Sequence, residues 1–194
     1  VWWCVGCVWG DCDVRSEFLS AILRLYNIEQ GSIRIDGFDV SQISLKKLRS
    51  HITIIPQHPN ILSGTLRYNL DPFNEYSQDE INKALVNSNS TSFVESLPDG
   101  LNTQMSSISS NISMGQKLLI CLARALLRKS KVILLDEATS SMDLVTVGII
   151  QSIIKNHFSD CTTISIAHRI HTIIDYDFVV VLEKGKIIEY DRPQ

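Results

Sequence analysis

Three short apolar runs, each followed at once by polar side chains, constrain the fold of this chain most strongly. The runs are Ile52–Ile55, Val132–Leu135 and Thr163–Ala167, and helical patterns separate them. Continuous apolar runs of this length are typical of strands that are buried on both faces of a parallel sheet. Their alternation with helices predicts a doubly wound α/β core.

The polar residues after these runs are the first candidates for a functional site. Gln57 follows the first run, Asp136 and Glu137 follow the second, and His168 follows the third. Because ligands of open α/β sheets sit outside the carboxyl ends of the strands, we expect these side chains to converge. Taken singly, each has a plain structural explanation as a helix cap, a loop residue or a surface histidine.

Two adjacent carboxylates after four apolar residues are costly to desolvate unless a cation compensates them, which favours a Mg²⁺ site. In that interpretation Asp136 holds the ion and Glu137 polarises an attacking water molecule. His168 contacts the transferred phosphate. The chemistry predicted for this edge is therefore phosphoryl transfer.

Composition and charge limit the other classes. The 194 residues have a formal net charge of -3, so no strongly basic field exists and nucleic acid is not an expected partner. The longest apolar run, Val1–Trp9, is far shorter than the roughly 20 residues of a membrane-spanning helix, so we expect no span in this chain. Since it lacks an initiator Met and a basic leader, the chain is interpreted as an N-terminally incomplete part of a longer polypeptide.

A second motif lies within residues 64–128, where helical patterns prevail and an inserted helical subdomain is predicted. Ser113-Met114-Gly115-Gln116 precedes the helical run Lys117–Lys129, and Ser113 and Gln116 form an S-x-x-Q capping box. Gly115 would let a ligand approach the backbone closely, and the helix N-terminus attracts anions. A plain capped core helix explains the same pattern.

The order of these motifs resembles that of the nucleotide-binding domain of ATP-binding cassette (ABC) transporters. The similar segments are Ile55-Pro56-Gln57 (Q-loop), Ile112–Gln116 (signature), Val132–Glu137 (Walker B), Ser140–Asp143 (D-loop) and His168 (H-loop). Residues 63–73 and 123–128 are similar to the second cassette of the C subfamily, the multidrug-resistance-associated proteins. The resemblance covers roughly residues 16–194 and implies one P-loop NTPase (RecA-like) domain with an inserted helical subdomain.

The resemblance implies that the chain uses ATP and Mg²⁺ for ATP hydrolysis coupled to transport. The implied catalytic residues are Glu137 and His168, the metal ligands are Ser16, Gln57 and Asp136, and the nucleotide contacts are Arg15, Ser16, Gln57, Ser113, Gly115, Gln116 and Asp143. Two such cassettes pair head to tail, so the signature would contact the nucleotide of a partner cassette. The implied setting is the cytoplasmic face of a membrane, beside the transmembrane domains of the parent transporter.

The phosphate-binding loop departs from the family pattern G-x-x-x-x-G-K-S/T. The matching stretch is Trp9–Ser16, with Trp9 and Val14 in place of the glycines and Arg15 in place of the lysine. A β-branched residue is disfavoured at positive φ, and a guanidinium does not replace an ammonium point charge, so we expect the loop not to cradle phosphate. Losing three or four charge-assisted contacts weakens ATP binding by more than about 4 kcal/mol, on the order of a thousandfold.

Two hypotheses follow. The first is an ATP-hydrolysing cassette that powers export, and the alternative is a catalytically dead cassette that only completes the ATP site of its partner. Residues 1–14 contain all three tryptophans and three of the five cysteines. We hypothesise that this stretch comes from a mispredicted exon, a retained intron or a frame error, which the transcript sequence tests.

Overall fold

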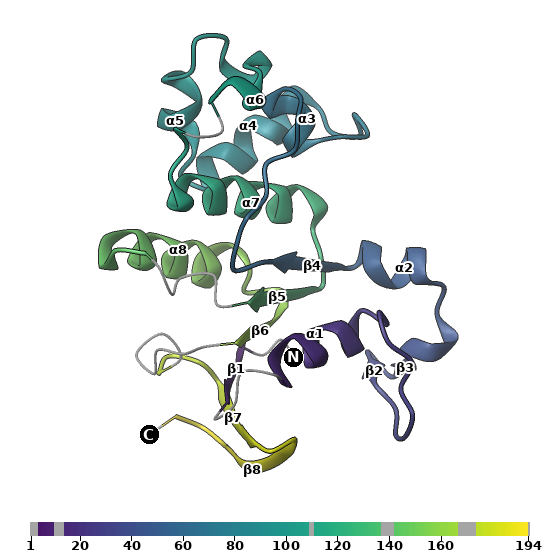
Figure 1. The fold of residues 1–194 in the computed structure, drawn as a ribbon. Coiled ribbons are helices and arrows are strands. Elements are labelled where there is room, and N and C mark those ends of the chain that lie inside the picture. Colours follow the sequence, from purple (N-terminus) through teal and green to yellow (C-terminus); the bar gives the residue numbers. More distant parts are fainter. Residues whose placement is uncertain (1–3, 10–13, 109–110, 137–141, 167–173, 194) are drawn as a thin grey trace. The chain divides into compact units, whose positions relative to one another are not determined.

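The structure, a computed structural model, describes residues 4–9, 14–108, 111–136, 142–166 and 174–193 (Figure 1). The strands are β1 Cys4–Trp9, β2 Arg34–Ile35, β3 Phe38–Asp39, β4 Ile52–Ile55, β5 Val132–Asp136, β6 Thr162–Ile166, β7 Phe178–Glu183 and β8 Lys186–Asp191. The α-helices are α1 Val14–Ile22, α2 Leu45–Ser50, α3 Leu66–Leu70, α4 Gln78–Asn87, α5 Thr91–Glu95, α6 Met105–Ile108, α7 Met114–Arg128 and α8 Leu144–His157; η1 Val40–Gln42 and η2 Gly100–Asn102 are 3₁₀ turns.

The chain forms two compact units. The first contains residues 1–54, 130–137 and 160–194, and the second contains residues 55–129 and 138–159. Each unit has its own cluster of buried apolar side chains. The predicted helical subdomain, residues 64–128, falls within the second unit.

A six-stranded sheet in the order β4-β5-β6-β1-β7-β8 organises the first unit. β5 pairs with β6, β6 with β1 and β1 with β7 in parallel, whereas β7 and β8 form an antiparallel hairpin. The prediction of an α/β core with a mainly parallel sheet is confirmed. β4, β5 and β6 lie side by side in chain order, whereas β1, the first strand of the chain, lies between β6 and β7.

How completely the side chains of a strand are buried depends on whether the strand is central or at the edge of the sheet. Residues 132–135 of β5 are all buried, as expected for a strand with a neighbour on each side and cover on both faces. In β4, by contrast, Ile54 is 38% exposed. The difference arises because β4 is an edge strand, which the apolar run alone does not reveal.

Helix α1 packs its apolar side chains, among them Leu19 and Ile22, into the core of the first unit. Two arginines hold the chain where this helix ends. The Arg24 guanidinium donates to the carbonyl oxygens of Val40 at 2.9 Å and Ile43 at 2.6 Å. Arg49 donates from Nε to the Leu23 carbonyl at 3.1 Å. The end of α1 is thereby fastened to η1 and α2.

Strand β1 belongs to the stretch whose composition is atypical, yet it pairs with β6 on one side and β7 on the other. Cys7 in this strand is 2% exposed, and burial raises the pKa of its thiol to about 12. The thiol therefore stays protonated at neutral pH and packs as a small apolar side chain. The hypothesis that residues 1–14 result from an error in the predicted transcript stays a hypothesis.

The second unit is built around α7, which contacts α3 and α4 (Figure 1). Side chains from several helices bury together with it, among them Leu66, Ile81 and Met105, each fully buried. Ser77 and Glu80 form a capping box that begins α4. In the described parts of the chain, no helix has the length and apolar character that crossing a bilayer requires.

Candidate functional site

The neighbouring strands β5 and β6 end on the same row of the sheet, and β1 extends two residues beyond that row. In the ladder, Asp136 of β5 is opposite Ile166 of β6, and Ile166 is opposite Cys7 of β1. Because these strands run parallel, the segments that follow them all begin at the same end of the sheet, the end formed by the carboxyl ends of the strands. The next residue after β5 is Glu137, and His168 comes two residues after β6.

The segment expected to bind phosphate lies between a strand and a helix. β1 ends at Trp9 and α1 begins at Val14, which places Arg15 and Ser16 in the first turn of α1. A loop that joins a strand to a helix N-terminus is the arrangement that phosphate-binding loops use. The side chains of Arg15 and Ser16 are not among the described ones, so their contacts stay a prediction.

The other catalytic predictions divide between the described and undescribed parts of the chain. Glu137 and His168 lie outside the described residues, and their roles stay predictions. Asp136, the predicted Mg²⁺ ligand, is half-buried at the end of β5. Gln57 lies two residues after β4, in the second unit.

The predicted capping box at the start of α7 is confirmed. The Ser113 hydroxyl accepts from the backbone N–H of Gln116 at 3.1 Å, and the Gln116 side chain accepts from the backbone N–H of Ser113 at 2.9 Å. By helix geometry the N–H groups of Met114 and Gly115 have no intrahelical acceptor, and they lie at the positive end of the helix dipole. This end of α7 is therefore suited to contact an anion.

Asp143 begins the neighbouring helix, α8. Its carboxylate accepts from the backbone N–H of Thr146 at 2.9 Å and from the Thr146 hydroxyl at 2.7 Å. These hydrogen bonds hold the pKa of Asp143 below its ordinary value, so the carboxylate stays ionised at neutral pH. The structure thus gives Asp143 a capping role, and its predicted contact with nucleotide stays a prediction.

Gly115 is where the starts of α7 and α8 meet. A Cβ atom at Gly115 would lie 3.0 Å from Cγ2 of Thr146 and 3.9 Å from the Ser113 hydroxyl. Any side chain at this position would displace Thr146, so the glycine allows the two helices to approach. Four of the predicted site residues, Ser113, Gly115, Gln116 and Asp143, thus belong to adjoining helix starts within the second unit.

Thr146 is the member of this arrangement that sequence reasoning missed. The spacing Asp143-x-x-Thr146 is a signal for a helix cap. No local pattern, however, links Thr146 to Gly115, which is 31 positions away in the chain.

Replacing Gly115 with alanine is expected to destabilise the chain, and Thr146→Ser is expected to reverse the effect. Overpacking costs about 1–3 kcal/mol, of which the better helix propensity of alanine offsets about 1 kcal/mol. Serine removes the Cγ2 atom in the way but keeps the hydroxyl that bonds Asp143. Urea unfolding of the two single variants and the double variant measures the coupling.

Gly148→Ala is the matched control, because a Cβ atom at Gly148 of α8 meets nothing within 4 Å. It is expected to leave stability unchanged or raise it by up to about 1 kcal/mol. Equal stabilities for Gly115→Ala with threonine and with serine at position 146 would contradict the proposed steric contact.

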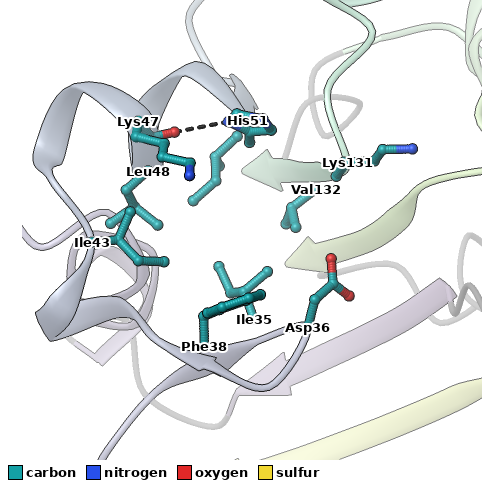
Figure 2. Close-up of a pocket in the computed structure, with 10 residues that line it drawn as sticks. Ile35, Asp36, Phe38, Ile43, Lys47, Leu48, His51, Lys131 and Val132 are labelled. Atoms are coloured by element: carbon teal, nitrogen blue, oxygen red, sulfur yellow. Dashed lines mark hydrogen bonds between the residues drawn. The ribbon is translucent and has the colours of Figure 1, made fainter.

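A separate pocket of about 240 Å³ lies in the first unit (Figure 2). Its walls are mostly apolar, and the charged or titratable side chains that line it are Asp36, Lys47, His51 and Lys131. The His51 ring bonds through Nδ1 to the Lys47 carbonyl oxygen at 2.8 Å, as drawn in Figure 2. Among the predicted site residues whose side chains the structure describes, none lines this pocket.

Comparison with known proteins places the chain in a family. The profile of the ABC transporter family matches residues 15–140, which is more than half of the chain. The mainly parallel α/β sheet of the first unit agrees with this match. The chain belongs to the ABC transporter family.

Its similar relatives include members of sub-family C. The chain is 50% identical to ATP-binding cassette sub-family C member 3 of Mus musculus, over 97% of this chain and 12% of the relative. It is 51% identical to human sub-family C member 2 over 93% of this chain, and 50% identical to the multidrug resistance protein mrp-7 of Caenorhabditis elegans over 92%. The chain spans 12% of the length of each of these three relatives.

A solved structure shows the same fold. A bacterial Atm1-family ABC exporter, determined with ATP bound, superimposes with a TM-score of 0.89 and 31% sequence identity. The match covers 98% of this chain and 34% of the exporter chain. The fold predicted from the sequence, that of an ABC transporter nucleotide-binding domain, is therefore confirmed.

Proposed function

We propose that the chain is the nucleotide-binding cassette of an ABC exporter, which hydrolyses ATP in a head-to-tail pair and thereby powers transmembrane transport. One observation carries the proposal: Asp136, Ile166 and Cys7 share one ladder row, at or within two residues of the carboxyl ends of β5, β6 and β1. The proposed catalytic glutamate, H-loop histidine and phosphate-binding loop follow these three strands in the sequence. The family membership and the ATP-bound exporter of similar fold support it.

In this proposal the residues near the carboxyl ends of the strands have different roles: metal binding, activation of water and contact with phosphate. Asp136 and the Ser16 hydroxyl offer hard oxygen donors, the kind that Mg²⁺ prefers, and Gln57 supplies a further one. Mg²⁺, when bound, neutralises charge on the β- and γ-phosphates. Glu137 orients the attacking water and takes its proton, while His168 contacts the transferred phosphate.

The second half of the proposal concerns the partner cassette. The paired helix starts in the second unit present the signature residues Ser113–Gln116, whose N–H groups and helix dipole favour a phosphate of the partner's nucleotide. The Asp143 carboxylate is held at the start of α8 by its hydrogen bonds to Thr146, beside the start of α7. Transmembrane domains complete the transporter, with the cassette at the cytoplasmic face.

Because the natural phosphate-binding loop is expected to bind ATP about a thousandfold more weakly, the catalytic half is tested in the chain with Trp9→Gly, Val14→Gly and Arg15→Lys. Its hydrolysis of MgATP is compared with that of the same copy carrying Glu137→Gln. Loss of a general base lowers the rate by about 10²–10⁴-fold, and we expect a loss of this size without a loss of ATP binding. Gly148→Ala serves as a control for nonspecific effects, since it lies in open space. Hydrolysis that is unaffected by Glu137→Gln would contradict the proposal.

The pairing half is tested with a loop-restored copy, defined here as the chain with Trp9→Gly, Val14→Gly and Arg15→Lys. This copy regains the G-x-x-x-x-G-K-S pattern and can load MgATP. The fluorescently labelled natural chain is titrated with the loop-restored copy carrying Glu137→Gln, with and without MgATP. Pairing that requires MgATP supports the proposal, and pairing that is equal without nucleotide contradicts it.

A further inference from the structure

A buried amide in the second unit has its full hydrogen-bonding capacity in use. Asn69, on α3, is 3% exposed. Its Oδ1 accepts from the Leu62 backbone N–H and from Nη2 of Arg124, both at 2.8 Å. Its Nδ2 donates to the carbonyl oxygens of Leu62 at 2.9 Å and Thr65 at 3.0 Å. The Asn69 side chain thereby holds the backbone at Leu62 and Thr65 against α3.

The Arg124 side chain reaches Asn69 from the signature helix α7. Its Nε donates to the Asn69 carbonyl oxygen at 2.6 Å, and its Nη1 donates to the Asn60 carbonyl oxygen at 3.2 Å. The Asn69 carbonyl lies in the last turn of α3, where backbone acceptors have no intrahelical donor. One guanidinium therefore satisfies the end of α3 and fastens the chain at Asn60 as well.

The hydrogen bond between Arg124 and Asn60 joins two segments of the proposed site, the one after Gln57 and the signature helix α7. Asn60 is three residues after Gln57, and Ser113 is the N-cap of the helix that carries Arg124. The eleven positions from Ser113 to Arg124 span about 16 Å of continuous helix. Buried side chains along α7 make this length a rigid element of the second unit.

We propose that Arg124 is a positioning residue that fastens the segment after Gln57 to the signature helix, so that a displacement of this segment moves Ser113–Gln116 as well. The inference rests on the proposed function, in which these signature residues contact the nucleotide of the partner. It assigns to Arg124 a role in coupling that follows from its bonds to Asn60 and Asn69.

The test uses the natural chain and its variants Arg124→Ala and Arg124→Lys. Arg128→Ala is the matched control, because Arg128 is an exposed arginine one turn further along α7. Two quantities are measured at a temperature where circular dichroism shows every variant fully folded. They are the amide exchange rate at Leu62, and the dissociation constant for the loop-restored copy with Glu137→Gln in MgATP.

We expect Arg124→Ala to speed exchange at Leu62 and to weaken pairing, each by about tenfold, because the lost bonds are charge-assisted. Arg124→Lys keeps the charge and part of the packing but not the forked geometry, so intermediate values are expected. Arg128→Ala is expected to change neither quantity. If Arg124→Ala does not fold, Arg124→Lys decides by the same two measurements.

The outcomes separate this inference from the proposed function. Faster exchange at Leu62 with unchanged pairing overturns the inference, since Arg124 would then only fasten a loop. Unchanged exchange at Leu62 overturns it too, because the fastening itself would be absent. A natural chain that shows no MgATP-dependent pairing overturns the proposed function, and with it this inference.

Discussion

Restoring the phosphate-binding loop with Trp9→Gly, Val14→Gly and Arg15→Lys is expected to strengthen MgATP binding by about a thousandfold. Glycines allow the turns that aim successive backbone N–H groups at the phosphates, and lysine reaches the β- and γ-phosphates as a point charge. The loop lies between β1 and α1, where such loops occur in P-loop proteins. Titration with a fluorescent ATP analogue, competed with ATP, measures the change.

Two controls show whether the gain comes from the loop. Ser16→Ala in the loop-restored copy removes the expected Mg²⁺ ligand, and it is expected to reduce the affinity for MgATP more than that for metal-free ATP. The single replacement Arg15→Lys, without the glycines, is expected to gain little, because the backbone N–H groups would stay misplaced. A thousandfold gain from Arg15→Lys alone would refute the role assigned to the glycines.

Leu134→Ala is expected to destabilise the chain by about 2–5 kcal/mol. Leu134 is fully buried in β5, between β4 and β6, and it belongs to the core of the first unit. Alanine removes apolar contacts and leaves a cavity that a parallel sheet cannot easily collapse to fill. For a domain of this size the midpoint of thermal unfolding should fall by roughly 5–15 °C.

Leu144→Ala is the control for this experiment. Leu144 is the first residue of α8 and is 73% exposed, so its truncation is expected to change stability by less than about 0.5 kcal/mol. Differential scanning calorimetry or urea unfolding compares the two variants. Equal effects of the two truncations would mean that β5 is not the centre of a packed core.

Local sequence patterns predicted the elements that local physics controls. The runs that became β4, β5 and β6 were recognisable from apolar residues alone, and the box between Ser113 and Gln116 needs only a spacing of three. The Asp36-Gly37 pair is a typical hairpin turn sequence, and both residues have positive φ, at 50° and 82°. In each case the interacting groups are neighbours in sequence.

Features that join distant residues were not predictable in this way. β1 pairs with β6 and β7, whose residues lie far along the chain, and no motif encodes this order of strands. The contact of Gly115 with Thr146 and the bonds of Arg124 to Asn60 and Asn69 likewise depend on how helices pack. Sequence reasoning predicted that a ligand approaches the backbone at Gly115, which stays a prediction, while the structure shows that Gly115 makes room for α8.

The strand order of the first unit has a consequence for synthesis on the ribosome. β1 is the first strand of this chain to be made, but its ladder partners begin with Cys4 opposite Thr163, roughly 160 residues later. At about 5–20 residues per second, an apolar strand without its sheet partners is accessible for several seconds or longer. The helical second unit contains most of the intervening chain and can begin to collapse meanwhile. Chaperones that bind short apolar segments are therefore expected to protect Cys4–Trp9 on nascent chains until β6 and β7 emerge.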